Sequence, residues 1–296
     1  MVDANTNTNT NTNTNLEAGT DAAPAGGVAA GLSVFELIAA GAKAIGANVP
    51  PAEIARLAES RDMGRSELEA VAATMSYLAG KKREKAVQMY LNMSHIPQKA
   101  PKTFANFDFS RLQGKGCDAI ARLPELSNIY ARRNLALIGP EGVGKSHLVK
   151  AYGRECCMRG MQAYYVKARE LSDKMAKAVK LGTEANLMNQ LVRPACLIID
   201  EIGRCRFDKE CTDLFFHVVD ARSEKDGPSA ILMTSNFTAD KWDECFTGGS
   251  TLLCTLDRLF DDATVFMIKG SSFRGQGLET YSVEATPSVS KLPAAK

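Results

Sequence analysis

The chain has 296 residues, of which 45% are hydrophobic and 24% are charged, and its formal net charge is +2. These values are ordinary for a globular protein, and a nucleic-acid-binding protein of this composition would have to cluster its basic residues. No apolar run reaches the ~18 residues of a membrane-spanning helix, and the eight cysteines fit neither a zinc site nor a disulfide framework. We therefore expect reduced thiols, no membrane partner and a cytoplasmic location.

The first 31 residues are of low complexity. Asn and Thr alternate from Asn5 to Asn15, and an Ala/Gly-rich stretch follows. Because such a segment has almost nothing to bury, we expect residues 1–31 to be a disordered tail.

Residues 32–98 are expected to form a small helical domain that binds a partner protein or DNA. Ser33 and Glu36 have the spacing of a capping box at the start of its first helix. Further helices are predicted at 52–60, 66–78 and 83–93. The pair on either side of Gly64 is either a helix-turn-helix that enters a DNA groove or a hairpin that docks a protein. The basic run at 81–85 is either a solvated helix face or a patch that contacts phosphates.

Three phenylalanines follow a proline-containing linker at 97–102. They could form an apolar wall for an adenine ring, or they could only seal the edge of the next domain. The three are Phe104, Phe107 and Phe109. Residues 112–130 are predicted to be helical around a break at Pro124.

From residue 134 onward, short apolar runs alternate with helical patterns. Strands are predicted at 134–138, 162–166, 195–200, 230–234 and 264–269. Helices are predicted after 145 and at 168–181, 184–191, 209–223, 239–246 and 251–260. This alternation predicts the α/β class, with a parallel sheet covered by helices on both faces. We expect this domain to span 99–276 and a flexible tail to occupy 277–296.

After the first strand comes GPEGVGKS, which matches the phosphate-binding P-loop pattern G-x-x-x-x-G-K-[ST]. Its glycines let backbone N–H groups point at phosphate oxygens, and the start of the next helix adds positive charge. Lys145 should reach the β- and γ-phosphates, and the Ser146 hydroxyl should hold Mg²⁺. The predicted nucleotide-binding residues are Gly139, Pro140, Glu141, Gly142, Val143, Gly144, Lys145, Ser146, His147 and Asp200.

The predicted strand at 195–200 ends in two adjacent carboxylates, Asp200 and Glu201. Ligands bind at the carboxyl ends of the strands in an open parallel sheet, so Asp200 should lie beside the P-loop and support Mg²⁺. Glu201 would polarise the water that attacks the γ-phosphate. The pair therefore predicts hydrolysis rather than a purely structural nucleotide.

Asn236 and Arg258 complete the predicted catalytic set with Lys145 and Glu201. Asn236 follows the fourth strand, where its amide can bond the γ-phosphate or the attacking water. Arg258 lies on a late helix, from which its guanidinium could stabilise a phosphoryl group bound by a neighbouring subunit. From the residue types alone, a surface ion pair with Asp257 or Asp261 is the simpler interpretation of Arg258.

The order of these motifs resembles the IstB-type ATPases, AAA+ helper proteins of insertion-sequence transposition that are related to DnaC-type helicase loaders. The resemblance covers residues 83–274 and is carried by GPEGVGKSHL, CLIIDEIGRCRFDKE, ILMTSNFTADKWDECF and TLDRLFDDATVFMIKGSSFR. It matches Asp200 and Glu201 to the family's acidic pair, Asn236 to its sensor, Arg258 to the arginine of its LDR block and Arg274 to a second arginine. Arg204-Cys205-Arg206 is more basic than the family's pattern and could add a DNA contact.

The resemblance implies an AAA+ fold that assembles into oligomers, with ATP between subunits and Arg258 acting in trans. It also implies that the oligomer engages double-stranded DNA and recruits a transposase. The predicted function is a DNA-stimulated ATPase that uses ATP and Mg²⁺ and assists transposition. Two alternatives stay open: a loader of a replicative helicase, and a nucleotide-gated interaction module that binds ATP but barely hydrolyses it.

Overall fold

The structure is a computed structural model that describes residues 32–114, 116–247, 256–261 and 263–269. The two predicted tails, Arg274 and Cys254 lie outside the described residues. The chain divides into two compact units, Met1–Ala79 and Gly80–Lys296. Within the described ranges, no helix is long and apolar enough to cross a membrane.

From residue 32 onward, the first unit is made of three helical segments. They are α1 (Val34–Ile45), α2 (Pro51–Ser60) and the first part of α3 (Arg65–Met93). The predicted capping box is present, because the Glu36 N–H donates to Ser33 Oγ at 3.3 Å and the Ser33 N–H donates to the Glu36 carboxylate at 2.6 Å. The helices share a small core that consists of Ile38, Ile54, Ala58 and Leu68.

The helix α3 is continuous, so the expectation of separate helices at 66–78 and 83–93 is wrong. A glycine inside a helix costs only about 1 kcal/mol relative to alanine, and Gly80 faces open space. The residues that follow are good helix formers, and an ion pair between Lys81 and Glu84 at 2.8 Å supports them. The helical propensity of the neighbouring residues is therefore sufficient for the helix to continue past Gly80.

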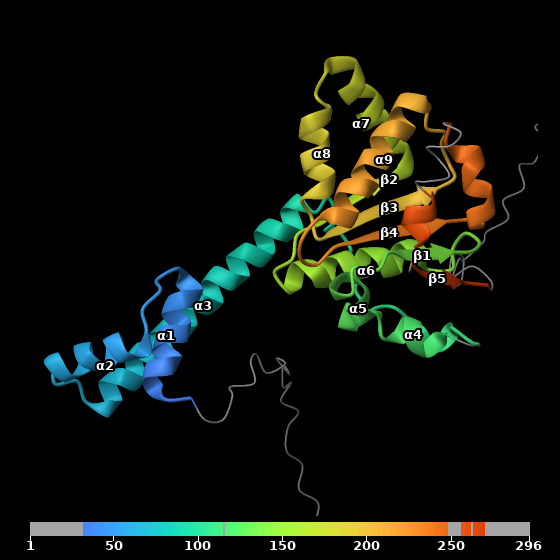
Figure 1. Cartoon of the computed structure of the whole chain (residues 1–296). Coiled ribbons are helices and arrows are strands. Elements are labelled where there is room, and N and C mark those ends of the chain that lie inside the picture. Colours follow the sequence, from blue (N-terminus) through green and yellow to red (C-terminus); the bar gives the residue numbers. More distant parts are fainter. Residues whose placement is uncertain (1–31, 115, 248–255, 262, 270–296) are drawn as a thin grey trace, which may run out of the picture. The chain divides into compact units, whose positions relative to one another are not determined.

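The second unit contains a five-stranded parallel sheet in the order β2-β3-β4-β1-β5 (Figure 1). The strands are β1 (Leu135–Ile138), β2 (Ala163–Lys167), β3 (Cys196–Ile202), β4 (Ala230–Ser235) and β5 (Thr264–Met267). The predicted α/β class and parallel sheet are confirmed. Strand β1 lies between β4 and β5, which places the carboxyl ends of β3, β4 and β1 next to one another.

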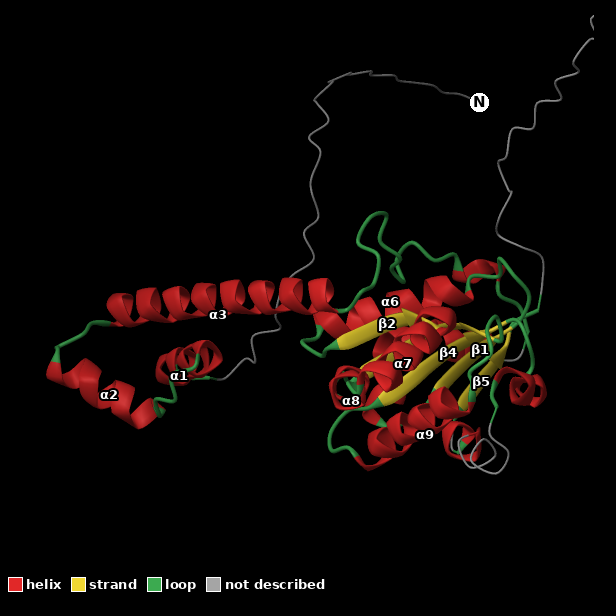
Figure 2. Ribbon diagram, turned by 90° about the horizontal axis from the view of Figure 1, so that it is seen from above, coloured by secondary structure: helices red, strands yellow, loops and turns green. Residues whose placement is uncertain are grey.

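Helices cover both faces of this sheet (Figure 2). They are α6 (Lys145–Met158), α7 (Ala168–Leu181), α8 (Glu184–Val192) and α9 (Lys209–Glu224). Neighbouring residues of a strand point to opposite faces, and on β3 this assigns Ile198 to the apolar cluster with α6 and Ile199 to the cluster with α7, α8 and α9.

Short helical pieces occupy the regions where longer helices are expected. They are η1 (Phe109–Arg111), α4 (Cys117–Ala121), η2 (Leu123–Glu125), α5 (Ser127–Tyr130) and η3 (Ala239–Cys245). The expectation that 112–130 is helical around one break is therefore too simple: besides Pro124, Leu126 interrupts the helix with a left-handed φ of 60°. Of the helix predicted at 251–260, residues 256–260 are described and helical.

A buried arginine of α9 joins the amino ends of the central strands. Arg222 is 3% exposed, and its guanidinium donates to five backbone carbonyls. These belong to Leu191, Val192, Pro194, Ala195 and Ala230. Burial lowers the pKa of Arg222 to about 10, so the side chain stays charged at neutral pH. Its charge is spread over carbonyl dipoles at the end of α8 and the starts of β3 and β4.

We expect Arg222→Ala to destabilise the second unit by about 3 kcal/mol, because the carbonyls would lose their donors inside the core. The only tryptophan, Trp242, is fully buried in this unit, so its fluorescence during urea unfolding reports on this unit. Lys177→Ala, at an exposed position of α7, should change stability by less than about 0.5 kcal/mol. Equal effects of the two substitutions would contradict the prediction.

Candidate functional site

Polar residues gather at the carboxyl ends of β1, β3 and β4. They line a pocket of about 250 Å³, formed by Lys102, Glu141, Gly142, Gly144, Lys145, Ser146, His147, Lys150, Glu201, Arg204, Thr234 and Asn236. The structure thus brings together most of the predicted P-loop residues, Glu201 of the acidic pair, and Asn236. The side chain of Val143 is buried in the core, and nucleotide binding through its backbone stays a prediction.

The P-loop starts at Gly139 in a place with no room for a side chain. A Cβ on Gly139 would lie 2.0 Å from the carbonyl oxygen of Ile268, and the Gly139 N–H donates to the Ser235 carbonyl at 3.1 Å. At Gly144, where φ is +90°, a Cβ would lie 2.6 Å from the Phe107 ring. Glycine is therefore needed at both ends of the loop. Gly139 allows a close approach of the backbone, and Gly144 allows both a close approach and a left-handed backbone conformation.

The Phe107 ring packs beneath the P-loop. It is 8% exposed, and its centroid lies 5.2 Å from the ring of His147. His147 Nε2 lies 2.8 Å from the Thr103 carbonyl, and burial lowers the pKa of His147. Phe104 and Phe109 pack against the same core. An adenine-binding role for the three phenylalanines stays a prediction.

The Lys145 ammonium is buried, at 6% exposed. It donates to the carbonyls of Gly139 and Pro140 at 2.7 and 2.6 Å and to Asn236 Oδ1 at 2.9 Å. The P-loop lysine and the predicted sensor residue therefore contact each other directly. These three acceptors are neutral oxygens, which an anion could replace.

The Asp200 carboxylate is 1% exposed and is held by hydroxyl groups. Ser146 Oγ donates to Oδ1 at 2.8 Å, Tyr165 OH donates to Oδ2 at 2.7 Å, and Thr234 Oγ1 also donates to Oδ1. Burial, and then the negative Asp200, raise the pKa of Tyr165 far above its ordinary value. The phenol therefore stays protonated and remains a donor.

The Glu201 backbone has a left-handed conformation, with φ of 66°. A conformation of this kind costs a non-glycine residue on the order of 1–3 kcal/mol and is typical of functional sites. Its N–H donates to Thr234 Oγ1 at 2.9 Å. Its carboxylate lies 3.3 Å from Lys167 Nζ and 3.6 Å from Arg204 Nη1. Glu201 thus lines the pocket between two cations while Asp200 is buried behind it.

The pocket lining holds four cationic side chains and two carboxylates, a balance that suits a polyanion. Lys150 Nζ lies 3.8 Å from Asp200 Oδ2. Burial lowers the pKa of Lys150. Ser146 and Asp200 offer hydroxyl and carboxylate oxygens at 2.8 Å from each other, which are ligands that Mg²⁺ accepts alongside nucleotide phosphates. Among the described residues, no group of three or more His, Cys, Asp or Glu side chains could form a metal site by itself.

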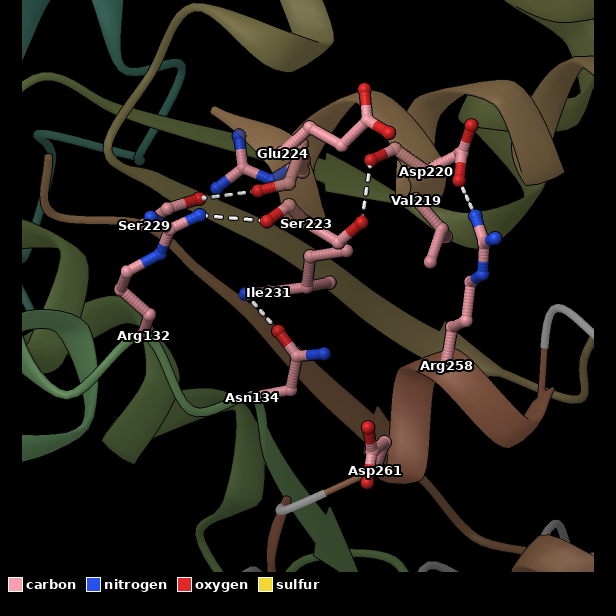
Figure 3. A pocket seen from close by; sticks show the side chains of 11 residues that line it. Arg132, Asn134, Val219, Asp220, Ser223, Glu224, Ser229, Ile231, Arg258 and Asp261 are labelled. Atoms are coloured by element: carbon pink, nitrogen blue, oxygen red, sulfur yellow. Dashed lines mark hydrogen bonds and ion pairs between the residues drawn. The ribbon is translucent and has the colours of Figure 1, made fainter. Parts of the chain in front are cut away.

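Arg258 does not line this pocket. It lines another cavity, of about 400 Å³, together with residues that precede β1 and β4. Figure 3 shows its guanidinium pointing to Asp220 of α9, with which it forms an ion pair, and it lies 5.3 Å from the centre of the Phe216 ring. The ion pair thus forms with an aspartate of α9, distant in sequence, rather than with one beside Arg258 in the chain.

Several residues that line the pocket or contact Asp200 are not assigned by the sequence analysis. Lys150 lies four positions after Ser146, so helical periodicity could have placed both on one face. Tyr165 reaches Asp200 because β2 pairs with β3, and the sequence does not reveal that pairing. Arg204 was noted as a possible DNA contact, whereas the structure places it in the pocket.

Comparison with known proteins identifies relatives of this chain. The family model of the IstB-like ATP binding protein matches residues 51–280. A protein named as the ATP-binding protein of insertion sequence IS5376, from Geobacillus stearothermophilus, is 32% identical over 195 residues, which are 65% of this chain and 75% of that protein. Its counterpart in insertion sequence IS21, from Pseudomonas aeruginosa, is 30% identical over 65% of this chain and 71% of that protein.

Among solved structures, a crystal structure of DnaI matches with 21% sequence identity and a TM-score of 0.48. The match covers 61% of this chain and 95% of that chain.

We expect Tyr165→Phe to destabilise the second unit by about 1–2 kcal/mol, because it removes one donor from a buried carboxylate. Tyr164→Phe is the matched control: its hydroxyl accepts from Lys174, a partly exposed cation that can return to water. Urea unfolding followed by Trp242 fluorescence measures both. A cost for Tyr165→Phe no larger than that for Tyr164→Phe would contradict the importance of the Asp200 contact.

Proposed function

Because the chain belongs to the family of IstB-like ATP-binding proteins, we propose that it binds and hydrolyses ATP in the P-loop pocket. The observation that carries the proposal is the convergence of Lys145, Glu201 and Asn236 on one cavity with an excess of positive charge. Glu201 lies at the carboxyl end of β3, Asn236 directly follows β4, and Lys145 begins the helix that follows β1. This is the arrangement expected for a nucleotide site in a parallel sheet.

In the proposed reaction, Lys145 exchanges its carbonyl partners for the β- and γ-phosphate oxygens. Asn236, already bonded to Lys145 at 2.9 Å, lies where its amide can bond the γ-phosphate. Glu201 orients a water molecule and accepts its proton as the oxygen attacks the γ-phosphorus and the bond to ADP breaks. Ser146 and Asp200 would be the protein ligands of Mg²⁺, which would supply positive charge to the phosphate oxygens.

The proposed biological role is assistance of DNA transposition, by recruitment or activation of a transposase. It is supported by the names of the relatives, which are ATP-binding proteins of insertion sequences. Contact with double-stranded DNA is supported by the basic run at 81–85, which is exposed on α3.

We further propose that the protein acts as a homo-oligomer with ATP between subunits. Arg258 is the residue that would reach a neighbouring subunit's nucleotide. Its place outside the P-loop pocket of its own chain and its partial exposure, 45% of the side chain, are compatible with this role.

Glu201→Gln should preserve ATP binding and lower turnover by at least about a hundredfold, because the amide cannot accept the proton from water. Lys145→Ala should instead lose nucleotide binding. Turnover is measured by phosphate release, and binding by calorimetry. Normal turnover in Glu201→Gln would show that Glu201 is not the base, and normal binding in Lys145→Ala would contradict the P-loop assignment.

Arg258→Ala should lower turnover while monomers still bind ATP. Mixing it with Glu201→Gln protein should restore part of the activity, because interfaces then form that combine an intact Glu201 from one chain with an intact Arg258 from the other. Light scattering of the mixture verifies co-assembly. No recovery in co-assembled protein at any ratio would contradict action in trans.

Affinity for double-stranded DNA should fall steeply with salt, by about a thousandfold between 50 and 200 mM if about six phosphates are contacted. Fluorescence anisotropy with Glu201→Gln protein and ATP measures this, and phosphate release by the wild-type protein tests whether DNA stimulates turnover. A flat salt profile with DNA-independent turnover would contradict the DNA role and favour a nucleotide-gated interaction module.

A further inference from the structure

A carboxylate of the P-loop itself lies among the groups that surround the proposed phosphate site. Glu141 is the third residue of GPEGVGKS. Its Oε1 accepts from Asn236 Nδ2 at 3.3 Å and forms an ion pair with Arg204 Nη2. Glu141 therefore contacts the predicted sensor residue and a guanidinium that the sequence analysis did not place in this pocket.

These contacts are part of a longer series across the pocket. Asn236 also accepts from Lys145 Nζ at 2.9 Å, and Arg204 also lies 3.6 Å from the Glu201 carboxylate. The series runs from the P-loop lysine through Asn236, Glu141 and Arg204 to the proposed base. Glu141, the carboxylate that the P-loop contributes to this series, thus lies between the amide of Asn236 and the guanidinium of Arg204. Both of these groups are able to bind phosphate oxygens.

Resting on the proposed ATPase function, we propose that Arg204 is a ligand of the γ-phosphate of ATP bound to its own subunit. Glu141 takes the place of that phosphate in the nucleotide-free protein. When ATP binds, the γ-phosphate displaces the Glu141 carboxylate from Arg204 and Asn236. ADP has no γ-phosphate, so with ADP the Glu141–Arg204 pair stays closed.

The energetics favour this exchange. The side chains of Arg204 and Glu141 are 44% and 62% exposed, and an exposed ion pair is easily broken because water replaces each partner. A phosphate offers a guanidinium two oxygens in the geometry of its fork, as a carboxylate does, but it carries more charge. A carboxylate that stayed beside the γ-phosphate would repel it, which gives Glu141 a reason to move.

The test compares the affinities of AMP-PNP and ADP, each with Mg²⁺, for the full chain by calorimetry. Arg204→Ala should weaken AMP-PNP binding on the order of tenfold, the loss expected for one charge-assisted contact, and change ADP binding by less than about twofold. Arg206→Ala is the matched control, since Arg206 is exposed and does not line the pocket, and it should change neither affinity.

Glu141→Gln provides the second arm. Removal of the competing charge should tighten AMP-PNP binding several-fold and leave ADP binding unchanged. The inference is overturned if Arg204→Ala affects both nucleotides equally or neither of them, or if Glu141→Gln weakens AMP-PNP binding as Arg204→Ala does. A wild-type protein that binds neither nucleotide would instead refute the proposed function on which the inference rests.

Discussion

The site depends on one buried charge, the carboxylate of Asp200. Taking a carboxylate out of water is costly unless hydrogen bonds replace its hydration, and here Ser146, Tyr165 and Thr234 supply them. The three hydroxyls belong to α6, β2 and β4, so satisfying a single side chain fixes three elements against β3. The P-loop helix, the acidic strand end and the strand before Asn236 therefore have set positions before any ligand arrives.

The same strand end separates the roles of two adjacent carboxylates. The pairing of β3 with β4 changes register between Ile199 and Ile202, and Glu201 has a positive φ within that irregularity. This local distortion leaves Asp200 buried among hydroxyls and Glu201 at the pocket between Lys167 and Arg204. One carboxylate is thus held in place by hydroxyl groups, while the other faces the space where a reacting water could lie.

The sequence was sufficient where short-range chemistry fixes the geometry. The P-loop pattern and Asn236 each follow a strand of the parallel sheet, and the acidic pair lies at the carboxyl end of another. Their meeting at one edge could therefore be expected. Whether Gly80 ends a helix could not be predicted, because the helical propensity of the residues around it outweighs the cost of one glycine. The position of Tyr165 beside Asp200 depends on the strand order, and the position of Arg204 in the pocket depends on the path of its loop. Neither could be predicted from the sequence. Arginines in helices are mostly exposed. The sequence therefore does not indicate that Arg222 is buried and donates to five backbone carbonyls.

The close fit of Gly139 against Ile268 has a consequence for the order in which the protein can fold during synthesis. The start of the P-loop contacts a residue 129 positions later (268 − 139), and β1 is flanked by β4 and β5. At translation rates of about 5–20 residues per second, β1 waits on the order of ten seconds for its last neighbour. Until then this buried strand has an unpaired edge, which is the kind of surface that other chains can join. The helical segments of the first unit, in contrast, are complete before β1 is made.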